Sequence, residues 1–263
     1  MSRRIMAALC LGAAVLLNTR CGDDADQLFY EFGEASGLEP AQWRGRELYG
    51  RYCAGCHGER GNGMGPAAPF LDPKPRDFTR GTYKFRTTPS SSLPTDADLV
   101  RTIREGVHGT SMPAWTTLPD AEVQAIVAWI KTFSKRFARE RPAPTLALPG
   151  APKDLDTAAR VERGQRVWDE LKCGLCHGER GQGDGPSAKS LIDSEGHPIP
   201  PFDFTRKEPK GGSTPEDLYR TFMTGLAGTP MPDFAETTRD DTQRWDLVAY
   251  VRSLRAGAAK ERR

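Results

Sequence analysis

Two short segments of the chain place two thiols and an imidazole close together. The residues of these Cys-x-x-Cys-His segments are Cys53, Cys56, His57, Cys173, Cys176 and His177. In each segment the cysteines are about one helical turn apart and the histidine follows at once, so on a helix all three side chains project from one side. Such a set can react with a flat organic cofactor and coordinate a metal at its centre.

Other uses of paired cysteines fit this pattern less well. Six cysteines permit three disulfides in an exported protein. A zinc ribbon places its two Cys-x-x-Cys pairs roughly 15 to 20 residues apart, whereas these are more than a hundred residues apart. A thioredoxin-like pair follows a buried strand, but a helical pattern precedes each segment here. Cys-x-x-Cys-His is typical of haem c, whose two vinyl groups take up the thiols and whose iron binds the histidine. We therefore expect two covalently bound haems.

The second axial ligand of each iron must be a soft or nitrogenous donor. Met112 and Met231 occupy matching positions in a Gly-Thr-x-Met-Pro sequence, 55 residues after His57 and 54 residues after His177. We expect these methionines to bind the irons, and His108 is the rival ligand in the first copy. The other candidate donors are not expected to bind iron. Met64 is too close to the motif, Met223 is expected in the core, and His197 is expected at the surface.

The two motifs belong to an internal repeat of about a hundred residues. CAGCHGERGNGMGPAA is echoed by CGLCHGERGQGDGPSA, and each copy later contains Asp-Phe-Thr-Arg. The repeat predicts a first haem domain at residues 41–139, a proline-rich linker at 140–156 and a second haem domain at 157–263. These domains are called the first repeat and the second repeat below. The prolines of the linker favour an extended, semi-rigid connection.

Apolar periodicity predicts three helices in each repeat and no sheet, which makes the fold all-α with long loops. Thr95 and Thr214 are placed to cap the middle helices, which end at Gly106 and Gly225. The apolar positions of the first and last helices are Leu48, Tyr49, Tyr52, Val123, Ile126, Val127, Ile130 and Phe133, and Val167, Trp168, Leu171, Leu247, Val248, Val251 and Leu254. Three short helices bury too little apolar surface for a stable domain, so a bulky cofactor is expected to complete each core.

The N-terminal segment predicts export. Residues 1–21 combine a basic start with an apolar stretch too short to span a bilayer, as in a signal peptide. The mature chain is then periplasmic or otherwise extracytoplasmic. Cys21 resembles the lipidated cysteine of a bacterial lipoprotein, but Arg20 stands where that pattern has a small residue, so lipidation and simple cleavage nearby both stay open. Membrane attachment is expected only through this end. Residues 22–40 are acidic and read as a flexible tether.

The charge of the chain excludes nucleic-acid binding and is unevenly distributed. From Cys21 onward there are 34 basic and 35 acidic side chains, unlike the strongly basic surface of a nucleic-acid binder. Residues 40–139 carry a net charge of +6 and residues 157–263 carry none. The basic side chains that cluster in one loop of the first repeat are Lys74, Arg76, Arg80, Lys84 and Arg86. They form either a solvated loop partly covered by the acidic tether or a docking surface for an acidic redox partner.

On these motifs, the chain from Trp43 to Leu254 resembles a tandem pair of class I c-type cytochromes. The resemblance implies that the first and last helices of each domain cross at a glycine beside aromatic residues. Gly45 and Gly164 match that glycine, and the aromatics beside them are Tyr49, Trp129, Trp168 and Tyr250. It also implies that a proline carbonyl orients each ligating histidine, which falls on Pro66 and Pro186.

The function implied is electron transfer without catalysis of its own. We expect an exported dihaem c-type cytochrome that carries electrons between respiratory or periplasmic redox partners. One alternative is a dihaem enzyme of the peroxidase type, which would lack an axial methionine in one repeat, whereas both are present. The other alternative is a cytochrome subunit of a larger membrane-associated redox complex, which an N-terminal lipid anchor would favour.

Overall fold

The computed structural model describes residues 37–206 and 208–261 of the chain. The predicted signal peptide, Cys21 and most of the predicted tether lie outside the described residues. Ala41–Arg263 form one compact unit. Among the described residues, no helix is both long and apolar enough to cross a membrane.

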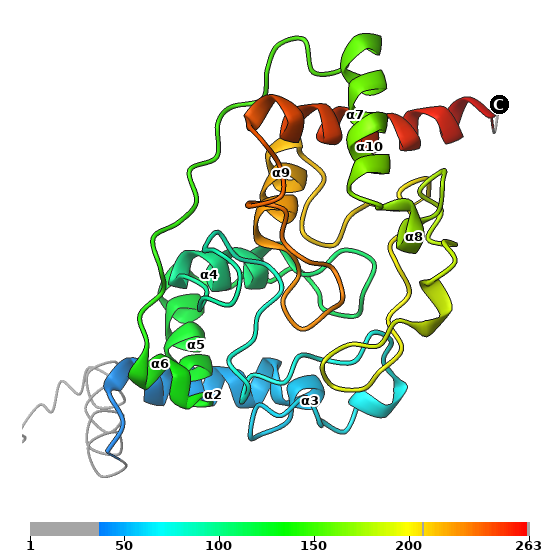
Figure 1. Cartoon of the computed structure of the whole chain (residues 1–263). Coiled ribbons are helices and arrows are strands. Elements are labelled where there is room, and N and C mark those ends of the chain that lie inside the picture. Colours follow the sequence, from blue (N-terminus) through cyan, green and yellow to red (C-terminus); the bar gives the residue numbers. More distant parts are fainter. Residues whose placement is uncertain (1–36, 207, 262–263) are drawn as a thin grey trace, which may run out of the picture. The chain divides into compact units, whose positions relative to one another are not determined.

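The described residues form helices joined by long loops (Figure 1). The elements of the first repeat are α2 (Pro40–Tyr52), α3 (Ala54–His57), the 3-10 helix η1 (Ala68–Phe70), α4 (Asp96–Glu105), α5 (Asp120–Thr132) and α6 (Lys135–Arg139). Those of the second repeat are α7 (Ala158–Glu170), α8 (Gly174–His177), the 3-10 helix η2 (Ala188–Ser190), α9 (Pro215–Thr224) and α10 (Asp241–Glu261). Extended pairing in these residues is limited to one isolated bridge between Ile192 and Pro198. The predicted all-α fold is confirmed.

The first and last helices of each repeat cross at a glycine, as the resemblance implied. A Cβ atom added to Gly45 of α2 would lie 1.9 Å from the carbonyl oxygen of Ala125 in α5. A Cβ atom added to Gly164 of α7 would lie 1.9 Å from the carbonyl oxygen of Asp246 in α10. Only a hydrogen fits at these positions, so the helix backbones touch. The same crossing forms although the second repeat has one more residue between its glycine and its first motif cysteine.

The middle helices begin and end where the sequence predicts. Thr95 accepts a hydrogen bond from the backbone N–H of Asp98, whose carboxylate accepts one from the N–H of Thr95. Thr214 and Asp217 form the same reciprocal cap at the start of α9. Gly106 and Gly225 follow the two helices with φ of 68° and 61°, a region that glycine enters at little cost. These helices therefore have fixed starts and sharp ends.

The short helix α6 was not predicted. Ser134 begins it by accepting a hydrogen bond from the N–H of Arg136. Arg136 also donates to the carbonyl of Gly81 at 2.9 Å, and the ring of Phe137 packs edge-on against Tyr83 at 5.9 Å. This helix therefore closes one side of the first repeat's core, whereas α10 continues as a single helix in the second repeat.

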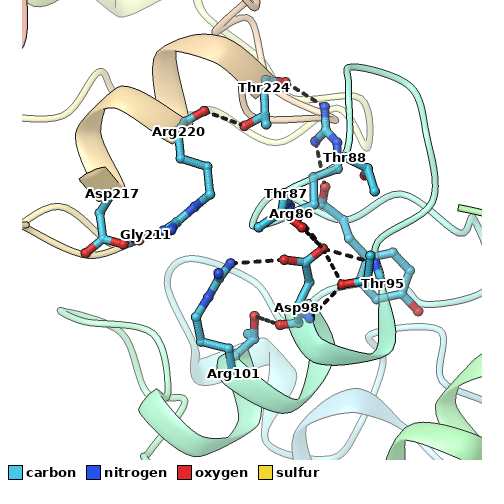
Figure 2. Close-up of polar contacts among 12 residues, drawn as sticks. Arg86, Thr87, Thr88, Thr95, Asp98, Arg101, Gly211, Asp217, Arg220 and Thr224 are labelled. Carbon is cyan, nitrogen blue, oxygen red and sulfur yellow. Dashed lines mark hydrogen bonds and ion pairs between the residues drawn. The ribbon is translucent and has the colours of Figure 1, made fainter. Parts of the chain in front are cut away.

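A buried arginine joins the two repeats, which corrects the interpretation of the basic loop. Arg86 is only 1% exposed, and it donates to the carbonyls of Tyr83 at 3.0 Å and of Thr224, at the end of α9, at 2.6 Å (Figure 2). The prediction that Arg86 belongs to a docking surface is wrong, because its guanidinium bonds main-chain carbonyls inside the protein. Charge in the sequence did not distinguish a buried arginine from a surface one.

Two further arginines of the same loop also face the second repeat. Arg76 forms an ion pair with Glu195 at 3.1 Å, and its side chain is 17% exposed. Arg80 donates to the carbonyl of Ser194 at 2.8 Å. Both partners lie in the segment that the second repeat inserts between its motif and its Asp-Phe-Thr-Arg sequence. Much of the positive charge of the first repeat is therefore used in contacts within the chain.

The linker is extended and is held against both repeats. Ala143 donates its N–H to the hydroxyl of Ser92, and Leu146 donates to the carbonyl of Thr87. Ala151 donates to the carboxylate of Glu216 in α9. These bonds fix a segment that the sequence identified only as semi-rigid.

Candidate haem sites

The motif residues of the first repeat lie on and just before α3. The N–H of Cys53 bonds the carbonyl of Tyr49 at 2.8 Å, so α2 leads directly into the motif. The N–H of His57 bonds the carbonyl of Cys53 at 2.9 Å, which places the imidazole one helical turn beyond the first thiol. Gly65 then returns the chain so closely that an added Cβ would lie 2.4 Å from the carbonyl oxygen of Gly55. The motif is therefore held from both sides.

The second repeat builds its motif with the same bonds. The N–H of Cys173 bonds the carbonyl of Trp168 at 3.0 Å, and the N–H of His177 bonds the carbonyl of Cys173 at 2.9 Å. Gly185 takes the place of Gly65, since its added Cβ would lie 2.4 Å from the carbonyl oxygen of Leu175. None of the four motif cysteines forms a disulfide with another described residue.

Each motif histidine bonds a main-chain carbonyl through Nδ1. The partner of His57 is the carbonyl of Arg76 at 3.0 Å, and the partner of His177 is the carbonyl of Phe202 at 3.0 Å. The expectation that Pro66 and Pro186 supply these carbonyls is wrong. The carbonyls come instead from the residue just before each Asp-Phe-Thr-Arg sequence, and the recurrence of that sequence was the available signal.

Burial lowers the pKa of both histidines, although the hydrogen bond to the carbonyl opposes the shift. The neutral imidazole is the form that binds metals. With Nδ1–H donating to a carbonyl, Nε2 keeps its lone pair for a metal, and the bond fixes the orientation of the ring.

An aromatic ring supports each histidine. Phe78 stacks on His57 with ring centroids 4.5 Å apart, and Phe204 lies against His177 at 4.9 Å. Both phenylalanines belong to the repeated Asp-Phe-Thr-Arg sequence. Each Asp-Phe-Thr-Arg sequence therefore places an aromatic ring against the imidazole. The residue just before it provides the carbonyl that orients the same imidazole.

The two predicted methionine ligands lie in loops of identical construction. In the first repeat, Met112 receives a hydrogen bond from Val107 N–H at its carbonyl and donates its own N–H to the hydroxyl of Thr110. In the second repeat, Leu226 and Thr229 make the same two contacts with Met231. Each methionine is therefore fixed by the backbone of a tight loop after the middle helix.

A cavity of the first repeat brings the predicted ligands together. Its lining includes Cys53, Cys56, His57 and Met112. Apolar residues from the three longer helices and the loops that line it include Tyr52, Phe78, Leu99, Ile103, Trp115, Ile126 and Ile130. Met64 is 79% exposed and His108 is exposed, and neither is in the lining of this cavity as described. The geometry thus favours Met112 over both rivals.

In the second repeat, Cys173 and Met231 pack against one apolar core, which also contains Trp168, Leu218 and Tyr250. Met223 is 8% exposed and belongs to this core, as expected. His197 lies beside Asp193 with its side chain 45% exposed. Another cavity of this repeat, lined mainly by α10 and the loop before α9, has no predicted ligand in its described lining, so it is not a candidate haem site.

Several groups of these sites fit a haem. Burial raises the pKa of Cys53 and of Cys173 to about 12, which reflects the apolar setting of both sulfur atoms. Tyr83 lines the cavity of the first repeat, and its hydroxyl is buried without a hydrogen-bond partner among the described residues. Trp168 Nε1 is likewise buried without a hydrogen-bond partner among the described residues, and its ring lies beside His177. Buried polar groups are rarely left unpaired, so a cofactor with acceptor groups suits both places.

Comparison with known proteins agrees with this geometry. Residues 40–130 match the family described as cytochrome c oxidase, cbb3-type, subunit III, and residues 161–255 match the family described as cytochrome c. The chain is similar to a solved chain of the Kuenenia stuttgartiensis reducing HAO-like protein complex Kustc0457/Kustc0458. The identity is 45%, the match covers 80% of this chain and 95% of that chain, and the TM-score is 0.78. No curated protein matches the chain.

A helical fold that presents Cys-x-x-Cys-His and a methionine loop in each of two repeats defines a haem-binding electron-transfer protein. The chain belongs to the cytochrome c family and contains two cytochrome c domains in tandem.

Proposed function

We propose that this protein is an exported dihaem cytochrome that carries electrons between periplasmic redox partners. Cys53 and Cys56 attach one haem through thioether bonds, and His57 and Met112 bind its iron. The corresponding residues of the second site are Cys173, Cys176, His177 and Met231. When bound, each haem supplies one-electron chemistry between ferrous and ferric iron.

The observation that carries this proposal is the cavity lined by both motif thiols, the imidazole and Met112. The chain's own contribution is to hold these donor side chains in fixed positions. The carbonyl of Arg76 orients His57, the loop bonded by Val107 positions Met112, and the apolar walls exclude water. With His57 and Met112 both bound to the iron, no coordination position would remain for a substrate, which favours a carrier over an enzyme.

Replacement of each methionine tests the ligand assignment. Met112→Ala and Met231→Ala should each remove about half of the weak near-infrared sulfur-to-iron band of the ferric protein. Each should also lower one of the two midpoint potentials and allow one iron to bind cyanide. Met64→Ala is the matched control, because Met64 lies near the first motif but is 79% exposed. A band of full intensity in either ligand variant would refute the assignment for that repeat.

An acidic partner is proposed to dock near the first haem through the lysines of the basic loop, because the three arginines of that loop bond groups within the chain. Lys74 is exposed and lines the edge of the first cavity, where it donates to the carbonyls of Ala68 and Pro69. Lys74→Glu should slow electron exchange with an acidic partner at low salt, and the effect should fade as salt screens the charge. Lys189→Glu on η2 is the control. Equal rates for both variants across a salt series would count against this docking site.

A second candidate function is that of a subunit in a larger redox complex. The similarity to a chain of a reducing HAO-like protein complex supports it. Purification of the tagged protein from its native membranes and periplasm under mild conditions distinguishes the two. A stable stoichiometric partner would support the subunit, and recovery of the protein alone would support the free carrier.

A further inference from the structure

A tight turn of the second repeat lies against the first repeat. The N–H of Gly212 bonds the carbonyl of Pro209 at 3.1 Å, and Gly212 has a φ of 105°, which favours glycine. Arg220 of α9 donates to the carbonyl of Gly211 at 2.8 Å (Figure 2). A Cβ added to Gly211 would lie 3.0 Å from the ring of Phe85, which lines the first cavity. The turn is therefore held in a fixed position beside that cavity.

Lys210 is the residue that this turn presents to the cavity. Lys210 lines the first cavity together with Lys84 and Arg76 of the first repeat, although it belongs to the second. The described lining also contains Lys74 but no carboxylate. A lining with four cationic side chains suits a ligand with negative groups at one end.

The cations of this cavity oppose one another in the protein alone. Burial lowers the pKa of Lys84 to about 8, and the positive charges of Arg76 and Lys210 lower it further, against the acidic side chains of Asp193 and Glu195. Glu195 pairs with Arg76 but is not in the described lining. Tyr83 also lines this cavity, and its hydroxyl is buried without a hydrogen-bond partner among the described residues. Two carboxylates placed here would relieve the repulsion and give the hydroxyl an acceptor.

The position of Lys210 does not depend on the turn alone. Arg86 ties the first repeat to the end of α9 through the carbonyl of Thr224 at 2.6 Å, and Arg220 of the same helix holds the turn. Both contacts are drawn in Figure 2. Helix α9 is therefore the element that sets the distance between Lys210 and the first cavity.

We propose that Lys210 of the second repeat completes the haem site of the first repeat by neutralising the haem carboxylates, together with Arg76 and Lys84. The inference rests on the proposed function, since it requires a haem in the first repeat. It assigns the carboxylate end of that haem to the boundary between the repeats. The potential of the first iron then depends on a residue of the second domain.

The test is a potentiometric titration of the full-length dihaem protein and its Lys210 variants. Reduction adds one negative charge at the iron, so a nearby cation favours the ferrous state and raises the potential. Lys210→Gln should lower the ferrous-to-ferric ratio of the first haem about tenfold at a fixed potential, which is a shift of roughly 59 mV for one electron. The Met112→Ala variant identifies which of the two potentials belongs to the first haem.

Three comparisons separate this role from a general change in structure. Lys210→Arg keeps the charge and should restore the potential, and Lys189→Gln, an exposed lysine of the same repeat, should shift neither potential. The second haem should be unaffected in all variants. A Lys210→Gln protein with two haems and unchanged potentials, or with both potentials lowered equally, would overturn the inference. A protein with no haem in the first repeat would instead contradict the proposed function.

Discussion

Substitution of the glycine at the first helix crossing should destabilise the protein through one steric contact. In Gly45→Ala the new Cβ would lie 1.9 Å from the carbonyl oxygen of Ala125 and 2.9 Å from Trp129 Cβ. Real Cβ atoms stay at least 3.0 Å from such neighbours, so α2 and α5 must separate by about 1.1 Å or more. A gap of that size removes a quarter to a half of the contact energy along the interface.

The expected cost is that of an overpacked core, about 1 to 3 kcal/mol. Gly50→Ala is the matched control, because Gly50 lies in the same helix and has nothing within 4 Å of an added Cβ. Alanine is the better helix former, so the control should gain about 0.5 to 1 kcal/mol. The two variants should therefore differ by roughly 1.5 to 4 kcal/mol.

Thermal and denaturant unfolding of the dihaem protein, followed by far-ultraviolet circular dichroism, measures this difference. A change of 1 kcal/mol corresponds to about 2 to 4 °C for a protein of this size, so the two melting temperatures should differ by roughly 3 to 16 °C. Melting temperatures within about 2 °C of each other would refute the close crossing of α2 and α5.

The remaining predictions concern three aspartates. Asp98→Asn should destabilise α4 by about 1 to 3 kcal/mol in urea unfolding, since the buried carboxylate accepts bonds from both Thr87 and Thr95; an unchanged midpoint would contradict the network. Asp246→Ala should lower the urea midpoint, because it removes the buried carboxylate that pairs with Arg160 and Arg163 of α7, although Arg160 keeps its ion pair with Asp154; an unchanged midpoint would show that these pairs do not stabilise the helix crossing. Although burial opposes the shift, hydrogen bonds from Thr214 and Arg220 lower the pKa of Asp217. The ionised Asp217 therefore stabilises the folded protein at neutral pH, and this stabilisation is lost as the pH falls from the unfolded pKa of about 4 through the lower folded value. Asp217→Asn should therefore make stability less dependent on pH below about 5, and an unchanged acid-unfolding curve would disprove this.

Much of the site could be predicted because covalent chemistry constrains sequence strongly. Two thiols and an imidazole must keep one spacing to serve one cofactor, so Cys53 and His57 stand out without any structure. The helix caps at Thr95 and Thr214 were predictable for a similar reason, since a cap needs particular side chains at fixed positions.

Contacts through the main chain could not be predicted in the same way. Any residue can offer a carbonyl, so the bond from His57 to Arg76 has no residue type of its own, and the resemblance pointed to Pro66 instead. The one feature of the sequence that indicates this hydrogen bond is the repeated Asp-Phe-Thr-Arg sequence, which begins at the residue after Arg76.

The role of charge also depended on three-dimensional position. Arg86 is buried and Lys210 lines the cavity of the other repeat, yet nothing in the sequence separates either residue from the other basic side chains around it. The contrast between them comes from the packing of α9 against the first repeat, which joins residues more than a hundred positions apart.

The haem content of the purified protein tests the central claim most directly. The account predicts two haems per chain that remain attached after denaturation, measured as the ratio of haem to polypeptide and as the mass of the intact chain. Cys173→Ala combined with Cys176→Ala should reduce that ratio to one and leave the first haem in place. A ratio of one in the unaltered protein, or haem released by denaturation alone, would contradict the account.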